Sequence, residues 1–86
     1  MGKSRNETET YSRNIGLDML IEYDGSGRQL YICMAYPSAL TSEAKWQIFK
    51  LSYDANGRIV KRRYASGNDN FDKIADNYAS YDYTDI

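Results

Sequence analysis

The chain has 86 residues, with 11 Lys and Arg against 12 Asp and Glu, a net charge of −1 and no histidine. This length supports one small domain. The near-neutral charge argues against a protein that coats nucleic acid, and the absence of histidine removes the commonest general base and metal ligand. A single cysteine, Cys33, excludes an intramolecular disulfide and a thiolate metal cluster. We therefore expect no enzyme activity, no cofactor and no metal site.

The first ten residues are polar and differ in composition from the rest of the chain. They contain no apolar residue after Met1, so they cannot repay the entropy lost on ordering. We predict a flexible N-terminal arm at residues 1–10 and a single small β-rich domain at residues 11–86. The arm lacks the apolar core of a signal peptide, and no apolar run approaches the length of a membrane span.

Two strands joined by a tight turn are predicted in the first half of the domain. Residues 17–23 alternate apolar and polar side chains, which is typical of a strand with one buried face. The two glycines in residues 24–27 then permit a hairpin turn. Residues 29–36 form a nearly continuous apolar run, so both faces of this strand are expected to be covered. Pro37 ends the strand because it cannot donate a ladder hydrogen bond.

A second hairpin is predicted in the middle of the chain. Residues 43–53 fit either a strand or a helix, because their apolar positions partly follow helical spacing. The strand is preferred because the Asn-Gly pair in residues 53–58 favours a hairpin turn, and a β-branched run at 59–64 follows at once. The alternation changes phase near Phe49, which predicts a β-bulge there.

The C-terminal part is predicted to contain one short helix and a last strand. Residues 65–70 are rich in turn-forming residues, and residues 71–78 place apolar side chains at helical spacing. Residues 80–84 then alternate Tyr with polar side chains, which favours a strand at a sheet edge. The predicted fold is therefore all-β: an antiparallel meander of two hairpins, with one short helix before the last strand.

Charge is divided along the sequence. Residues 43–64 carry a net charge of +4, whereas residues 65–86 carry −4. These segments are expected to pair within one fold or between neighbouring copies, or else to form solvated faces. The only dense basic run is 61–63, and it has two interpretations. Together with nearby aromatic residues, it would bind single-stranded nucleic acid. Alternatively, its charges would prevent an exposed sheet edge from pairing with another strand.

Several segments resemble a family of short structural proteins of tailed-bacteriophage virions. The resemblance is carried by residues 31–37 (YICMAYP), 41–48 (TSEAKWQI), 53–58 (YDANGR) and 67–81 (GNDNFDKIADNYASY). The last segment is similar to an ending in which a Trp and an Arg are usual. Here Ala75 replaces the Trp and Tyr78 replaces the Arg, and Tyr64 stands where a Trp is common. A contact that this Trp and Arg make in relatives would be altered in this chain.

The resemblance implies a virion component of the neck, tail or fibre-attachment region, made in the bacterial host cytoplasm. Its partners would be other virion proteins and copies of itself, without a membrane and without nucleic acid. Nine tyrosines suit either cross-strand packing or a contact surface. The alternative is a small phage-encoded regulatory or single-stranded nucleic-acid-binding module. The candidate interaction residues are Tyr31, Trp46, Lys61, Arg62, Arg63, Tyr64, Asp72, Asp76 and Tyr81.

Overall fold

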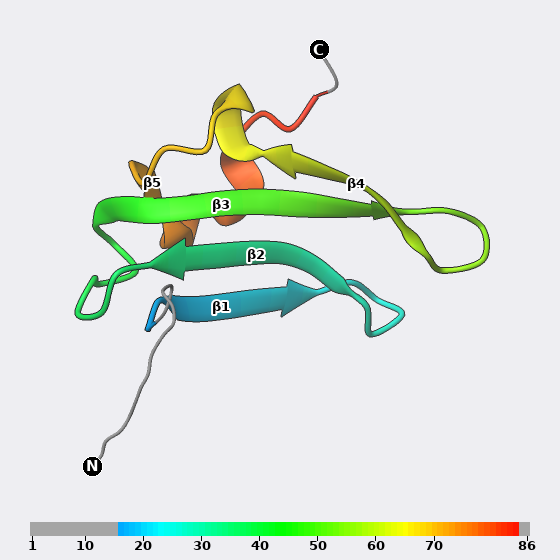
Figure 1. Cartoon of the computed structure of the whole chain (residues 1–86), viewed down its shortest axis with the longest axis horizontal. Helices are drawn as coiled ribbons and strands as arrows, with labels where there is room; N and C mark the ends of the chain where they lie inside the picture. Colours follow the sequence, from blue (N-terminus) through cyan, green and yellow to red (C-terminus); the bar gives the residue numbers. More distant parts are fainter. Residues whose placement is uncertain (1–15, 85–86) are drawn as a thin grey trace.

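The computed structural model describes residues 16–84, which form a twisted antiparallel sheet with a short C-terminal segment packed on one face (Figure 1). The strands follow one another in the order β1-β2-β3-β4, so each neighbour in the sequence is a neighbour in the sheet. The predicted all-β meander of two hairpins is confirmed. Its strands are β1 (Asp18–Tyr23), β2 (Gln29–Ala35), β3 (Ala44–Tyr53) and β4 (Ile59–Tyr64).

The two hairpin turns use the same side-chain chemistry. In the first, the Asp24 carboxylate accepts the backbone N–H of Arg28 at 2.9 Å and its Nε at 3.1 Å. In the second, Asp54 accepts the same two groups of Arg58 at 3.0 and 2.9 Å. The glycine before each arginine has a φ of +84° or +80°, a region that glycine enters at little cost. The predicted turns are confirmed, although in the second the glycine alone takes the left-handed conformation.

The segment after β4 differs from its prediction. It contains the 3₁₀ turn η2 (Ala65–Gly67), the two-residue strand β5 (Lys73–Ile74) and the 3₁₀ turn η3 (Ala75–Ser80). The predicted helix at 71–78 is therefore wrong, because its first half pairs with β3 as a strand and only a tight turn follows. The predicted last strand at 80–84 is also wrong, since the tyrosines there point onto the sheet and do not pair along an edge.

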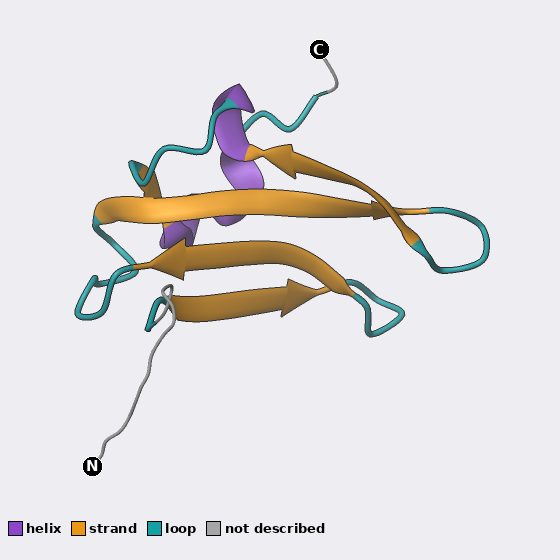
Figure 2. Cartoon of the chain, viewed as in Figure 1, coloured by secondary structure: helices purple, strands orange, loops and turns teal. Residues whose placement is uncertain are grey.

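One face of the sheet, which we call the covered face, carries the main core. The helical turns lie on this side (Figure 2). Trp46 and Ile48 are 2% and 1% exposed, and they pack with Cys33 and with two alanines of the C-terminal segment. The indole Nε1–H of Trp46 donates to the Leu40 carbonyl at 2.9 Å, so its polar group is satisfied despite burial. Trp46, one of the candidate interaction residues, therefore lies in the core of the domain.

The opposite face, which we call the open face, carries a second apolar cluster. Ile32, Phe49 and Leu51 are each 6% exposed and lie on β2 and β3. Their alternation with the covered-face residues continues through Phe49 without a register shift. The bulge predicted at Phe49 is therefore wrong, because the phase change reflects a strand with apolar residues on both faces. The expectation that β2 is buried on both faces is confirmed by Ile32 and Cys33.

Tyrosine side chains fasten the C-terminal segment to the covered face. The ring of Tyr31 on β2 packs edge-on against Tyr78 and Tyr83, with centroids 4.9 and 5.4 Å apart. The Tyr83 hydroxyl donates to the Tyr78 carbonyl at 2.5 Å, and the Tyr81 hydroxyl accepts the Ile74 N–H at 2.7 Å. These contacts let a segment with little regular secondary structure act as the second layer of the fold.

One prediction about the ends of the chain lies outside the region described. The predicted flexible arm, residues 1–10, falls within the part of the sequence that the structure does not describe, as do residues 85–86. Within 16–84, no helix is both long and apolar enough to cross a membrane.

Candidate protein-binding surfaces

The open face combines apolar side chains with a cation. Partly buried residues surround the three buried residues of the cluster, so that each of the strands β1 to β4 contributes at least one side chain. These border residues are Ile21, Met34, Tyr53 and Tyr64. The Arg62 guanidinium lies 5.0 Å from the ring centroid of Phe49 and 5.6 Å from that of Tyr64. Because Arg62 remains exposed, its guanidinium lies over two aromatic rings and still presents a positive charge to a partner.

A hollow of about 360 Å³ lies at the β3–β4 end of the open face. Its lining includes Phe49, Leu51 and Arg62 together with Ile59 and Val60, which are 57% and 55% exposed. An apolar floor with a cationic rim is suited to an inserted aliphatic or aromatic side chain that is followed by a carboxylate.

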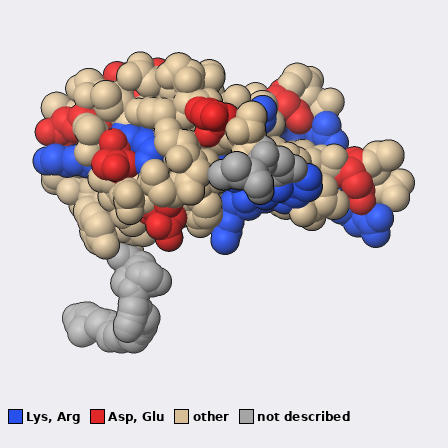
Figure 3. Space-filling model, turned by 90° about the horizontal axis from the view of Figure 1, so that it is seen from above, with Lys and Arg blue, Asp and Glu red and all other residues tan. Residues whose placement is uncertain are grey.

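Of the other cations of the predicted basic run, Arg63 lies on the opposite side of the sheet, whereas Lys61 also lines the hollow. Lys61 and Arg63 alternate with Arg62 along β4, as the strand geometry predicts. Arg63 is directly opposite Lys50 on β3, and Lys61 is two residues further along the same strand face. Lys61 and Arg63 each also have an interaction partner within the chain. Figure 3 shows Lys and Arg side chains gathered on the side of the molecule that carries β4.

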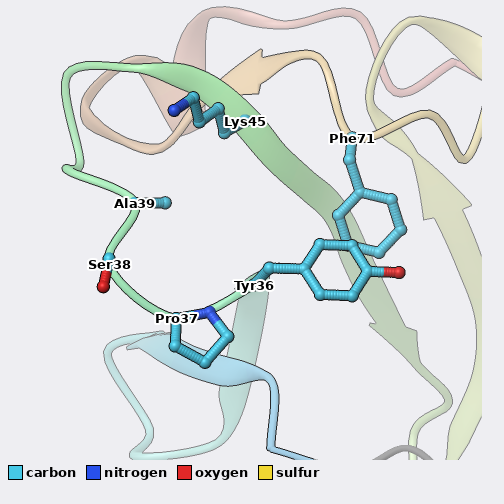
Figure 4. Close-up of a pocket in the computed structure, with 6 residues that line it drawn as sticks. All are labelled: Tyr36, Pro37, Ser38, Ala39, Lys45 and Phe71. Carbon is cyan, nitrogen blue, oxygen red and sulfur yellow. The ribbon is translucent and has the colours of Figure 1, made fainter.

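A third surface feature is a hollow of about 280 Å³ beside the loop after β2 (Figure 4). The rings of Tyr36 and Phe71 stand next to one another there, with centroids 5.3 Å apart. Tyr36 is 66% exposed, and Lys45 reaches the hollow from β3. Lys45 also pairs with Glu43 at 3.6 Å. This feature is smaller than the open face and draws its lining from a loop.

The structure brings together only some of the candidate interaction residues. Arg62 and Tyr64 share the open face, and Lys61 and Arg63 share the reverse side of β4. The others lie elsewhere: Trp46 is in the core, Tyr31 and Tyr81 hold the C-terminal segment, and Asp72 and Asp76 are exposed beside β5 and in η3.

Asp72 and its neighbour Lys73 form an ion pair at the edge of the core. Lys73 is 5% exposed, and its Nζ donates to the Asp72 carboxylate and to Asn68 Oδ1, the latter at 2.8 Å. A buried lysine needs such partners because an isolated buried charge is very costly. The acidic side chain therefore has a structural role, which does not depend on a ligand.

The electrostatics of the described residues reflect local structure. Backbone N–H groups of Arg28 and Arg58 hold the pKa values of Asp24 and Asp54 below their ordinary values. Burial raises the pKa of the Cys33 thiol to about 11, so this group is protonated at neutral pH. Within residues 16–84, no group of three or more Cys, Asp and Glu side chains is placed to hold a metal ion.

Sequence reasoning missed the residues that form the open face. The candidate interaction residues did not include Phe49, Leu51 and Tyr53, because the change of alternation near Phe49 was interpreted as a β-bulge and not as a second apolar face. The signal was present in the sequence: apolar residues at 46 and 48 are followed by apolar residues at 49, 51 and 53. In a strand, such a change of parity means that both faces are apolar.

Comparisons with protein-family models, with curated proteins and with solved structures find no match to this chain. The resemblance to tailed-bacteriophage structural proteins therefore stays a prediction.

Proposed function

We propose that this protein is a structural subunit of a tailed-bacteriophage virion and acts through protein–protein assembly in the neck, tail or fibre-attachment region. The proposal is supported by the resemblance of the segments between residues 31 and 81. The observation that carries its mechanism is the open face, where a sheet of four strands presents an apolar cluster rather than a polar surface.

An apolar open face is unusual for a one-sided sheet. Antiparallel sheets that face water on one side usually alternate apolar residues toward the core with polar residues toward solvent. Here the residues that pack on Ile32, Phe49 and Leu51 all belong to the four strands, within the part of the chain that the structure describes. These three residues are themselves buried, and exposed apolar surface is supplied at their border by Met19, Ile59 and Val60. Exposed apolar surface beside polar groups is characteristic of an interaction site. The face therefore fits a subunit that is completed by its neighbours.

The chemistry of the open face indicates what a partner subunit would present. Ile59 and Val60 offer exposed apolar surface at the hollow, which favours an aliphatic or aromatic side chain. Arg62 lies at the rim above Phe49, so a carboxylate of the partner would gain a charge-assisted hydrogen bond. The matching partner surface is an apolar ridge bordered by Asp or Glu.

The proposal is tested on purified particles of the phage that encodes the chain. Mass spectrometry is expected to find the protein at a fixed copy number. The variant Arg62→Glu is expected to lower its incorporation at least tenfold, because it places like charge against the partner's carboxylates. Asp76→Lys reverses a charge at an exposed position of η3, outside the open face, and should leave incorporation unchanged. Particles that lack the wild-type protein would overturn the proposal.

A second candidate function, binding of single-stranded nucleic acid, is favoured by the reverse side of β4. Lys50 and Arg63 are directly opposed there, and the Lys50 Nζ lies 5.6 Å from the Tyr31 ring centroid. A cationic patch beside an aromatic ring is the usual platform for such a strand. A gel shift at two salt concentrations distinguishes the two functions. Salt-sensitive binding that is lost on the double change Lys50→Glu and Arg63→Glu would favour nucleic acid.

A further inference from the structure

We propose that copies of this chain join edge to edge, with the outer edge of β1 in one copy pairing with the outer edge of β4 in the next. The junction is an antiparallel main-chain pairing that continues the sheet from copy to copy. It concerns contacts between copies of this chain alone, so it goes beyond the proposed role in a virion.

Both edges are available for such pairing. Among the described residues, β1 pairs only with β2, and β4 pairs only with β3. β1 is apolar yet exposed, with Met19, Leu20 and Tyr23 at 53%, 39% and 58%. Beside the end of β4, a hollow of about 210 Å³ separates the strand from Thr84. Exposed edge strands present unpaired N–H and C=O groups that another strand can satisfy.

The number of strands makes the two edges compatible. Directly opposed residues form rows across the sheet, and along a row the backbone groups of successive pairs point alternately toward and away from each other. With four strands, the backbone N–H and C=O groups of the two end residues of a row therefore both point into the sheet or both point away from it. The registers define two such rows: Glu22–Tyr31–Lys50–Arg63 on one face and Ile21–Ile32–Phe49–Tyr64 on the other.

Strand direction satisfies the same requirement. Successive strands alternate in direction, so β1 and β4 run antiparallel to each other within the sheet. When β4 of one copy meets β1 of the next with both sheets facing the same way, the new pair is antiparallel. The outward-pointing backbone groups on both edges then belong to residues of the same face. The covered and open faces would therefore continue across the junction without interruption.

The charges on the two edges select this pairing over the alternatives. β1 carries Asp18 and Glu22, whereas β4 carries three consecutive cations at 61–63. Pairing β1 with β1 would place carboxylates together, and pairing β4 with β4 would place cations together. Like charges that face each other across an interface repel, which suppresses the wrong pairing. Only the pairing of β1 with β4 joins opposite charges.

Registers that differ by an even number of residues keep both faces of the junction matched, and the register proposed here pairs Glu22 with a cation. It sets Glu22 against Lys61 and Leu20 against Arg63 on the covered-face side. On the open face it sets Ile21 against Arg62, and it also sets Met19 against Tyr64. A shift by one residue would move every side chain of the incoming strand to the wrong face. The ion pair between Glu22 and Lys61 is therefore the contact that a charge-swap experiment addresses.

This contact is heterologous, because a different surface is used on each copy. Such contacts produce a ring when the rotation between copies closes, and an open fibre when it does not. The pairing of β1 with β4 therefore makes assembly extend beyond a dimer, and this distinguishes it from a symmetric contact between the open faces of two copies.

Sedimentation velocity of the purified full-length chain across a concentration series tests the inference. The wild type is expected to form species larger than a dimer. Glu22→Lys and Lys61→Glu should each weaken association roughly tenfold, since each replaces an attraction by a repulsion. An equimolar mixture of the two variants should recover the association, because each junction can then join opposite charges. Asp76→Lys, an exposed acidic position outside both edges, should behave as the wild type.

Three outcomes would overturn the inference: a wild-type chain that stays monomeric, one that stops at a dimer, or a Glu22→Lys variant that associates as well as the wild type. Circular dichroism of each variant separates lost association from lost folding, and the mixture supplies the same control. A monomer that is present in phage particles would refute the edge pairing alone. A self-associating chain that is absent from particles would refute the virion role alone.

Discussion

The covered face and the open face are built from the same strands, yet they use their apolar residues differently. On the covered face, Trp46 and Ile48 lie beneath a C-terminal segment that the chain itself supplies. On the open face, Phe49 and Leu51 are shielded only by neighbouring side chains of the sheet, as far as residues 16–84 show. A single alternating strand thus serves folding with one set of residues and presents a contact surface with the other.

The difference follows from what a chain of this size can bury. A small domain removes a modest fraction of its surface from water, so its stability depends on a few large side chains. Here the second layer is a segment of short turns, and it covers one face. This segment does not cover the other apolar face, and the proposed partner subunit would add to the stability of the domain by binding there.

The largest effect expected is the loss of Trp46 from the covered face. Trp46→Ala should lower the free energy of unfolding by about 3–5 kcal/mol, because it leaves a cavity and removes the hydrogen bond to Leu40. That is a large part of the stability of a small domain. Chemical denaturation followed by circular dichroism measures the change.

A matched substitution at a partly exposed position on the same face of β3 sharpens this result. Lys50→Ala changes a residue of the same strand at a partly exposed position, and its unfolding free energy should stay within about 0.5 kcal/mol of the wild type. If Trp46→Ala were as stable as Lys50→Ala, the covered face would not be the source of stability, and the contrast between the two faces would collapse.

The next effect is a loss of stability at alkaline pH that originates on the covered face. Burial raises the pKa of Cys33 from 9.0 to about 11 in the folded chain. Stability from this group is complete below pH 9 and is lost as the pH rises through 11, to a total of about 2–3 kcal/mol. The Tyr83 pKa is also raised by burial, so it acts in the same direction at higher pH.

The thiol contribution is isolated by comparison with Cys33→Ala. Unfolding free energies of both proteins are measured between pH 8 and pH 11, and the wild type is expected to lose more stability over this interval. Equal pH dependence in the two proteins would mean that the thiol is accessible to water in the folded state. Slow reaction of Cys33 with a thiol reagent at neutral pH is the corresponding kinetic observation.

Sequence patterns predicted the sheet better than the segment that covers it. Hairpins are local: Asp54, Gly57 and Arg58 encode their turn within five residues, so the strand order follows from the sequence. The C-terminal segment depends instead on distant partners. Ile74 pairs with Ala44, and its backbone N–H donates to the Tyr81 hydroxyl. The helical spacing at 71–78 contains no information about either contact. Tertiary pairing overrode the local pattern there.

The candidate surface was predicted only in part for a related reason. The basic run at 61–63 is visible in the sequence, and its division between two faces follows from strand geometry. That Arg62 lies over Phe49 depends on the register of β3 with β4, which a bulge between Ser52 and Tyr53 shifts near the turn. Pairwise contacts across strands therefore required the structure.

A smaller effect is expected where the cover is fastened to the sheet. Tyr81→Phe removes the hydroxyl that accepts the Ile74 N–H at 2.7 Å. The cost should be about 1–2 kcal/mol, since a partly buried donor loses its partner while the ring still packs. Hydrogen exchange at the Ile74 amide should accelerate more than exchange in β2. Unchanged protection at Ile74 would show that the cover is held by ring packing alone.

The smallest effect on stability, and the one that separates the two faces most sharply, is expected at Arg62. Its guanidinium lies on the rings of Phe49 and Tyr64 but remains exposed, and contacts of this kind contribute about 0.5–1 kcal/mol at exposed sites. Arg62→Ala should therefore lower the unfolding free energy by no more than that amount. Incorporation into particles should fall far more than the stability change accounts for, because a central cation at an interface acts mainly on binding. Arg62→Lys keeps the charge without the planar stacking group, so it should recover part of the incorporation. If Arg62→Ala unfolded the chain as Trp46→Ala does, the open face would be a second core and the division between folding and binding would fail.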